Sequence, residues 1–183
     1  MTNIFYLICY LSIGLYRMWM NISVKGRRKC YARLVRKTAE SIGFGLKVNN
    51  ISSVNFYTIL GNNVNFNGMS IMGKGKVRIG NNFHSGTNCV IITSYHNYDK
   101  GTTIPYDNTY YHKDVIIEDN VWLGNDVTIL GGVTIGEGAI IQIGSVVVSN
   151  IPALAIAGGN PARVYKYRDK DHYFKLKAKG KFN

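Results

Sequence analysis

The chain has 183 residues, of which 46% are hydrophobic, so it fits one domain with a complete core, and a second independent domain is not expected. It carries 22 Lys and Arg against 10 Asp and Glu, an excess that favours an anionic partner such as a cofactor phosphate, an acidic glycan, a lipid head group or nucleic acid. Its three cysteines lie far apart and lack the spacing of a zinc or redox site, which indicates a reducing compartment.

The first feature along the chain is an apolar segment, residues 4–20, which would be hydrophobic on every side of a helix. It barely reaches the lower length limit for crossing a bilayer, and it lacks the charged start and the cleavage site of a secretory signal. A basic cluster follows directly: Lys25, Arg27, Arg28 and Lys29. This order is typical of an interfacial helix held against anionic lipid. Two hypotheses stand for residues 1–29: peripheral association of a cytoplasmic protein with the inner face of a membrane, or a helix that caps a repeat domain or packs in an oligomer interface.

A six-residue repeat dominates the middle of the chain. Aliphatic residues recur without a slip at Ile117, Leu123, Ile129, Ile135, Ile141 and Val147. A second series keeps the same period two residues ahead, at Val115, Val121, Val127, Val133, Ala139 and Ser145. Neither a helix nor a hairpin has this period. Flat strands with a turn at each corner would give a triangular coil whose aliphatic residues stack inward, so the sequence predicts an all-β fold, a parallel β-helix.

Earlier coils and one excursion complete the predicted prism. The same phase appears in the segment KVRIGNNFHSGTNCVII, and less regular coils are expected from about Ser41, with a slip between Asn67 and Gly73. Ile91 and Ile117 are not separated by a multiple of six residues, so the chain must leave the prism between them and return in phase. Residues 97–114 are polar and rich in Tyr, Gly and Asp, which predicts a protruding loop of the kind that carries binding groups.

The predicted organisation therefore has three parts. A helical segment covers residues 1–40, the β-helix covers residues 41–162, and a basic tail with a short helix covers residues 163–183. The tail alternates basic and aromatic residues, a pattern that nucleic-acid binding would use. A solvated terminal helix at the end of the prism explains the pattern more simply, so no nucleic-acid partner is expected.

Four features together resemble the hexapeptide-repeat acyltransferases, in particular the galactoside, maltose, xenobiotic and polysaccharide O-acetyltransferase branch. They are the coils that begin with an aliphatic residue and Gly, and the segments IIEDNVWLGNDVTILGGVTIG, GSVVVSNIP and AGGNPARVYK. The resemblance covers roughly residues 60–166. It implies a left-handed β-helix, although parallel crossovers are normally right-handed. It also implies a homotrimer with acetyl-CoA, the co-substrate, in the groove between neighbouring prisms.

His96 is the candidate catalytic residue. It sits where a coil ends and the long loop begins, and the segment TSYHNYD matches the place where the family carries its catalytic histidine. An uncharged imidazole there can take the proton of an acceptor hydroxyl while the oxygen attacks the thioester carbon, without a covalent acyl-enzyme. His84, His96 and His112 do not have the ligand spacing of the related β-helical carbonic anhydrases, so no metal is expected.

The resemblance also implies binding residues. Trp122 matches a tryptophan near the pantetheine arm of the cofactor, with an outward aromatic over a subunit seam as the alternative. The remaining cofactor positions are Asn125, Ile143, Val148 and Ser149 along the groove, and Arg163 and Lys166 at the CoA phosphates. Ile143 and Ser149 depart from the small residue and the lysine often found there. On the acceptor side, Asn65 and Asn67 match an NFN segment, and Tyr98 could stack on a sugar ring or only hold the loop down.

The leading functional hypothesis is an acetyl-CoA-dependent O-acetyltransferase that modifies a sugar hydroxyl of a surface polysaccharide or lipid-linked saccharide. A second hypothesis keeps the cofactor and His96 but replaces the acceptor by the amine of an amino-sugar nucleotide, by an antibiotic or by a small thiogalactoside. A third is a non-catalytic β-helical scaffold whose groove serves only for assembly.

Overall fold

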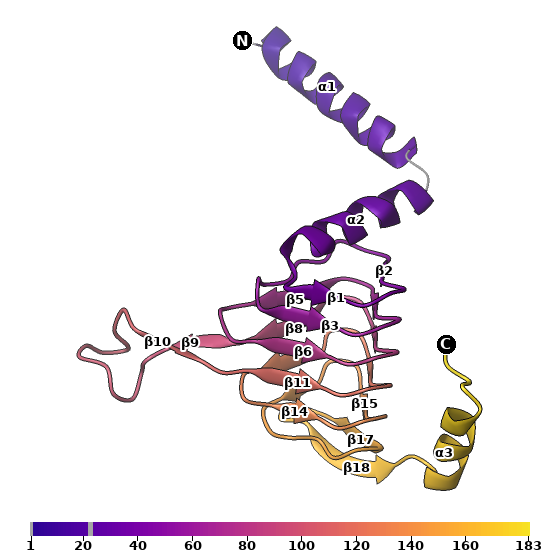
Figure 1. Ribbon diagram of the computed structural model, residues 1–183. Helices are drawn as coiled ribbons and strands as arrows, with labels where there is room; N and C mark the ends of the chain where they lie inside the picture. Colours follow the sequence, from indigo (N-terminus) through magenta and orange to yellow (C-terminus); the bar gives the residue numbers. More distant parts are fainter. Residues whose placement is uncertain (1, 22–23) are drawn as a thin grey trace.

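A stack of β-coils lies between helices at its two ends in the computed structural model, which describes residues 2–21 and 24–183 (Figure 1). The helices α1 (Thr2–Asn21) and α2 (Val24–Thr38) precede the coils, and α3 (Lys170–Ala178) follows them. No helix within the described ranges combines the length and the hydrophobicity needed to cross a bilayer.

Each coil passes through three parallel sheets, A, B and C, in that order. Sheet A contains β1 (Ser41–Ile42), β3 (Thr58–Leu60), β6 (Val77–Ile79), β11 (Val115–Ile117) and β14 (Thr134–Ile135). Sheet B contains the parallel strands β2 (Lys47–Val48), β4 (Asn65–Phe66), β7 (His84–Ser85), β12 (Trp122–Leu123), β15 (Ile140–Ile141) and β17 (Ala155–Gly158), with β18 (Arg163–Tyr167) antiparallel at its edge. Sheet C contains β5 (Met69–Met72), β8 (Cys89–Ile92), β13 (Thr128–Leu130) and β16 (Val146–Val147). The predicted parallel β-helix is therefore confirmed.

The core is the column of inward side chains that the hexapeptide period predicts. Both aliphatic series are buried, and Ser145, the polar member, donates a hydrogen bond from its hydroxyl to the Gln142 carbonyl at 2.7 Å. The coil from Leu60 to Ile79 is one residue longer than the later coil from Ile117 to Ile135. Inside the earlier coils Phe66 and Phe83 are buried, and their rings meet edge to face at 6.0 Å.

The excursion between sheets C and A is a hairpin rather than an unstructured loop. Its strands β9 (Ser94–His96) and β10 (Tyr110–His112) are antiparallel, and His96 lies opposite Tyr110. The predicted loop, residues 97–114, therefore ends earlier than expected, since residues 110–112 pair with residues 94–96. The hairpin leaves the prism at the corner between sheets C and A, and that corner is opposite sheet B (Figure 1).

The two N-terminal helices have different surroundings. Helix α2 covers the open end of the prism and buries Tyr31 and Val35 in the core. Helix α1 extends away from the coils, and its described apolar side chains, among them Tyr10 and Leu15, are exposed (Figure 1). The capping hypothesis thus describes α2, whereas nothing in the described residues covers α1.

The C-terminal segment differs from the solvated tail that its composition predicts. Strand β18 (Arg163–Tyr167) first pairs antiparallel with β17, and α3 then folds back beside sheet B. Tyr173 of α3 is buried, and the backbone oxygen of Asn183 accepts a hydrogen bond from Asn63 at 2.7 Å. The expected terminal helix is therefore present and largely exposed, but it lies beside sheet B rather than beyond the end of the prism, because Tyr173 packs on the coils.

Candidate functional site

His96 lies in the projecting hairpin with its ring between two tyrosines. Its centroid is 3.9 Å from that of Tyr106 and 4.3 Å from that of Tyr110. These contacts fix the plane of the imidazole. Within the described part of the chain, His96 Nδ1 is buried and has no hydrogen-bond partner. Buried polar atoms without partners are rare in folded proteins and are typical of functional groups that another molecule completes.

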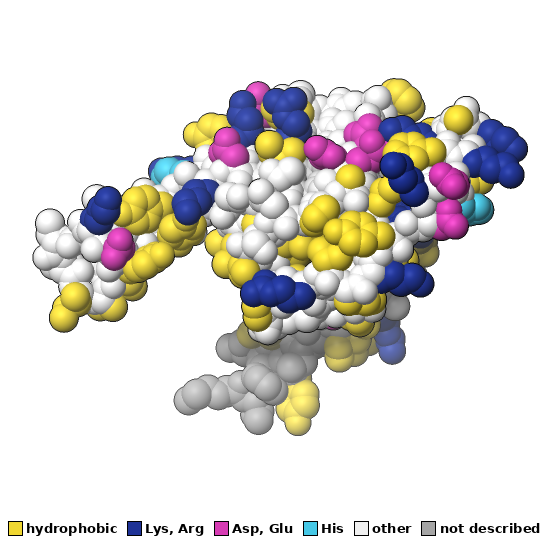
Figure 2. All heavy atoms as spheres, turned by 90° about the horizontal axis from the view of Figure 1, so that it is seen from below, with side chains coloured by type: hydrophobic (Ala, Val, Ile, Leu, Met, Phe, Trp, Pro, Cys, Tyr) yellow, Lys and Arg dark blue, Asp and Glu magenta, His cyan; other side chains and the backbone are white. Residues whose placement is uncertain are grey.

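The hairpin around His96 is held by its own polar contacts. Asp107 accepts hydrogen bonds from the backbone N–H groups of Thr102 and Thr109 and from the Thr109 hydroxyl. The Thr109 contacts, with a smaller effect of the nearby His96, lower the pKa of Asp107, so this carboxylate stays ionised. Tyr98 is exposed near Tyr95, with ring centroids 6.5 Å apart. Seen from below, the hairpin projects from one side of the molecule with hydrophobic and charged side chains on its surface (Figure 2).

A single row of outward side chains crosses sheet B. Parallel pairing places Lys47 beside Asn65, Asn65 beside His84, and His84 beside Trp122. Ile140 continues the row after Trp122. Successive members of a row on one face of a sheet lie close enough to contact one ligand. The structure thus brings together Asn65 and Trp122, which the resemblance assigns separately to the acceptor and the cofactor.

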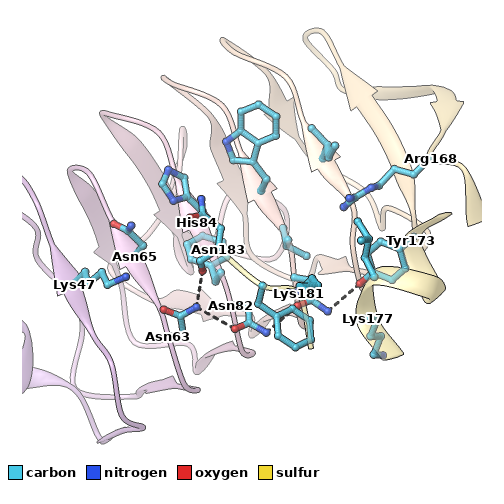
Figure 3. A pocket seen from close by; sticks show the side chains of 17 residues that line it. Lys47, Asn63, Asn65, Asn82, His84, Arg168, Tyr173, Lys177, Lys181 and Asn183 are labelled. Atoms are coloured by element: carbon cyan, nitrogen blue, oxygen red, sulfur yellow. Dashed lines mark hydrogen bonds between the residues drawn. The ribbon is translucent and has the colours of Figure 1, made fainter. Parts of the chain in front are cut away.

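The row forms one side of a groove, and the C-terminal segment forms the opposite wall. Figure 3 shows Lys47, Asn65 and His84 on sheet B facing the segment that carries Tyr173, Lys177 and Lys181. The helix is anchored by the Tyr173 hydroxyl, which donates to Glu137 Oε1 at 2.8 Å, and by the Lys177–Glu137 ion pair. The wall therefore depends on contacts between residues far apart in the sequence.

His84 is a groove residue that sequence reasoning missed. Its Nε2 lies 3.3 Å from Asn67 Nδ2, and Asn67 also accepts a hydrogen bond from Asn49 at 2.8 Å. Asn67 thus contacts His84 and is not among the residues that line the groove. Burial, with the positive charge of Lys47, lowers the pKa of His84, so its imidazole is neutral near pH 7. Its place directly before a buried hexapeptide position, as for Trp122, is the signal that could have identified it.

The other expected cofactor residues are not among those that line this groove. Asn125 and Ile143 occupy stacked turns between sheets B and C, where Asn125 Oδ1 accepts a hydrogen bond from the Thr87 N–H. Val148 and Ser149 form the turn after sheet C. Arg163 and Lys166 lie on β18. All six side chains are exposed.

The candidate residues therefore occupy two sides of the molecule. His96 is on the hairpin at the corner between sheets C and A, whereas Asn65 and Trp122 face outward from sheet B (Figure 1). In a triangular prism these positions point away from each other. Within residues 2–21 and 24–183, no group of three or more His, Cys, Asp and Glu side chains could hold a metal ion.

Comparison with known proteins agrees with this architecture. The family model described as bacterial transferase hexapeptide (six repeats) matches residues 114–149. The galactoside O-acetyltransferase of Escherichia coli (strain K12) is 35% identical over 124 residues, which are 66% of this chain and 57% of that protein. The chain spans 55 to 62% of the lengths of three curated relatives that it matches, including two galactoside O-acetyltransferases.

Two solved structures share the fold. A galactoside acetyltransferase in complex with coenzyme A superposes with a TM-score of 0.69 and 26% identity, covering 84% of this chain and 75% of that chain. A hexapeptide-repeat acetyltransferase of Vibrio cholerae in complex with acetyl coenzyme A superposes with a TM-score of 0.65 and 26% identity, covering 85% of each chain. Both bind the cofactor class that the resemblance implies.

Proposed function

We propose that this chain, which belongs to the hexapeptide-repeat acetyltransferase family, transfers the acetyl group of acetyl-CoA to a hydroxyl of a saccharide, with His96 as the general base. The observation that carries the proposal is the position of the His96 ring and the lack of a hydrogen-bond partner for its Nδ1 in the described chain. Its ring is oriented by Tyr106 and Tyr110 on a projecting hairpin, and its Nδ1 lacks a partner in the described chain.

The proposed reaction is direct transfer. The neutral His96 imidazole removes the proton of the acceptor hydroxyl as the oxygen attacks the thioester carbonyl carbon. The tetrahedral intermediate then collapses, the bond between carbon and sulfur breaks, and the imidazolium returns its proton to the departing thiolate. The products are the acetyl ester and CoA, and no acyl-enzyme forms. The Asp107 carboxylate lies on the same hairpin, where the hydrogen bonds from Thr109 and Thr102 lower its pKa and keep it ionised.

We further propose that the working enzyme is a homotrimer with each active site between two chains. The opposite positions of the hairpin and of sheet B support this arrangement, because His96 of one copy would approach Asn65 and Trp122 of the next. Acetyl-CoA would then lie along the seam. Asn125, Ile143, Val148 and Ser149 would line it, and Arg163 and Lys166 would meet its phosphates; all six side chains are exposed in a single chain.

The catalytic role is tested by CoA release from acetyl-CoA with a panel of free, nucleotide-linked and polymeric sugars. His96→Ala should lower the rate by a hundredfold or more, since general-base catalysis contributes about 10² to 10⁴. The matched control is His112→Ala, in the facing strand, where Nδ1 lies 2.7 Å from the Ser94 hydroxyl. Unchanged activity in His96→Ala would refute the assignment, and CoA binding without transfer to any acceptor would favour the scaffold hypothesis. Transfer only to an amine would favour the N-acetyltransferase hypothesis.

The shared site is tested by complementation. His96→Ala and Asn65→Ala should each be strongly impaired alone. Coexpression should restore activity, because in mixed trimers some interfaces combine an intact His96 with an intact Asn65. Sedimentation should show about three times the chain mass of 20.5 kDa. Mixed assemblies that stay inactive would show that each site lies within one chain.

We also propose that the N-terminal helices hold this cytoplasmic enzyme at an anionic membrane that carries its acceptor, a lipid-linked saccharide or nascent surface polysaccharide. The support is the exposed apolar surface of α1 followed by the basic residues at the start of α2, such as Lys25 and Arg28. Residues 1, 22 and 23 of this segment lie outside the described part. Sedimentation with vesicles should show binding to phosphatidylserine-rich membranes that weakens in Lys25→Gln/Arg28→Gln, and no binding to either anionic or neutral vesicles would refute the proposal.

A further inference from the structure

The groove over sheet B is strongly cationic. Four basic side chains line it: Lys47, Arg168, Lys177 and Lys181. No Asp or Glu side chain lines the groove among the described residues. An electropositive groove of this kind concentrates anions and orients their negative groups.

Two of these four cations are already used by the fold. Lys177 forms an ion pair with Glu137. The Arg168 guanidinium donates to the Gly138 carbonyl at 3.1 Å and lies 4.7 Å from the centre of the Tyr173 ring. Both contacts hold α3 on the prism, so neither side chain is available for a ligand without loosening the wall.

The other two cations have no such role. Within the described chain, neither Lys47 nor Lys181 has a carboxylate within ion-pair distance. Lys47 starts the row on sheet B and affects His84 electrostatically, two strands away. Lys181 extends from the opposite wall. The groove therefore presents two unpaired positive charges from its two sides.

The same groove also contains groups suited to a sugar ring. Trp122 is half exposed and offers a flat apolar face, and Asn65 offers an amide that can both donate and accept hydrogen bonds. His84, neutral at pH 7, adds no charge there. An aromatic face, an amide and two lysines together match a saccharide that carries a negative group.

We propose that this groove selects an anionic saccharide as the acceptor, with Lys47 and Lys181 binding its carboxylate or phosphate group. This inference rests on the proposed acetyltransferase function and narrows its substrate class. The lysines act through charge-assisted hydrogen bonds, which a neutral sugar cannot form. A neutral acceptor leaves both ammonium groups without a partner.

The test compares three matched acceptors: galactose, galacturonate and galactose 6-phosphate. In the wild type, kcat/KM should be at least about tenfold higher for one or both anionic sugars than for galactose. Lys47→Gln and Lys181→Gln should each remove most of that preference by raising KM for the anionic sugars. The comparison of galacturonate with galactose 6-phosphate shows whether the groove prefers a carboxylate or a phosphate. Lys175→Gln, on α3 but outside the groove, is the matched control.

Two outcomes would overturn the inference. Equal kcat/KM for neutral and anionic sugars would show that the groove does not select charge. Alternatively, the two lysines could bind the phosphates of the cofactor. Their loss would then raise KM for acetyl-CoA but leave the reaction with acetyl-pantetheine, which lacks those phosphates, unaffected.

A binding measurement separates failure of this inference from failure of the proposed enzyme. Trp122 and Trp19 are the tryptophans of the chain, so Trp19→Phe leaves Trp122 as the fluorescent reporter in the groove. Galacturonate or galactose 6-phosphate should shift its fluorescence at a concentration about tenfold lower than galactose does, and Lys47→Gln should abolish the difference. If no acceptor is acetylated but this selective binding remains, the enzymatic proposal fails and the anionic site stands. If binding is not selective, the inference fails.

Discussion

The hydroxyl of Tyr173 donates a hydrogen bond to Glu137 Oε1 at 2.8 Å, and the hydroxyl oxygen of Tyr173 accepts one from the Asn120 side chain at 2.9 Å. One side chain of α3 thus joins two successive corners of the prism. Burial, and then the hydrogen bond to Glu137, raise the pKa of Tyr173 to about 12, so the hydroxyl keeps its proton at physiological pH. This contact fixes the outer wall of the groove.

Removing this hydroxyl should loosen the wall without emptying the core. Tyr173→Phe keeps the buried ring but leaves Glu137 and Asn120 each short of a hydrogen bond, so the free energy of unfolding should fall by about 1 kcal/mol. Hydrogen exchange should increase first in α3. Phe174→Leu, at an exposed neighbouring ring, is the control. Unchanged exchange in α3 of Tyr173→Phe would show that the contact does not hold the helix.

Two glycines distinguish the energetic cost of backbone strain from the cost of a steric clash when a side chain is added. Gly138 and Gly144 have φ of +69° and +68°. A Cβ at Gly138 would lie 2.7 Å from Leu154 Cδ2 and 2.8 Å from the Tyr173 ring, whereas a Cβ at Gly144 would have no neighbour within 4 Å. Gly144→Ala should therefore lower the free energy of unfolding by about 1 kcal/mol from backbone strain alone. Gly138→Ala should cost about 1–3 kcal/mol more because α3 must move. Equal effects in chemical denaturation would contradict this packing.

Neighbouring isoleucines of β11 test the phase of the repeat. Ile117 is fully buried, whereas Ile116 is 42% exposed on the outer face. Ile117→Ala should reduce the free energy of unfolding by about 2–5 kcal/mol, because it leaves a cavity in a close-packed column. Ile116→Ala should reduce it by less than about 1 kcal/mol. The reverse order in urea denaturation would mean that the register of the coils is wrong.

The environment of His84 predicts a titration that nuclear magnetic resonance can follow. Burial and the charge of Lys47 hold its pKa below the ordinary 6.5, so the unfolded chain binds the proton first as the pH falls. The neutral ring therefore contributes stability above about pH 6.5 that declines as the pH drops toward the folded pKa. Lys47→Gln should raise the pKa of His84 but leave it below 6.5, because burial remains. An unchanged pKa would place Lys47 too far from His84 to share a ligand with it.

Local repetition explains how much of this protein was predictable. The inward series from Val115 to Val147 follows from a six-residue period, because each strand repeats the geometry of the strand one coil earlier. The same reasoning located the excursion and its histidine. It overestimated the loop, because the pairing of His96 with Tyr110 depends on contacts between strands outside the repeat.

The candidate site was only partly predictable. Family resemblance pointed to Asn65 and Trp122, but not to the row that places His84 between them, since the partners of a strand in a stacked coil lie in other coils. The path of the C-terminal segment was missed for a related reason. Its sequence has no repeat, and its position depends on Tyr173 meeting Glu137 and on Asn63 meeting Asn183 across most of the chain.

The sequence by itself thus determined the β-helix, the phase of its core and the place of His96, because these depend on a short period and on a family pattern in the linear chain. Only the tertiary structure decided that His96 and sheet B face opposite ways and that the tail builds a cationic groove with Lys47. The physical reason is that stacking is enforced by burial at every repeat, whereas the groove arises from single contacts between distant, non-repeating segments.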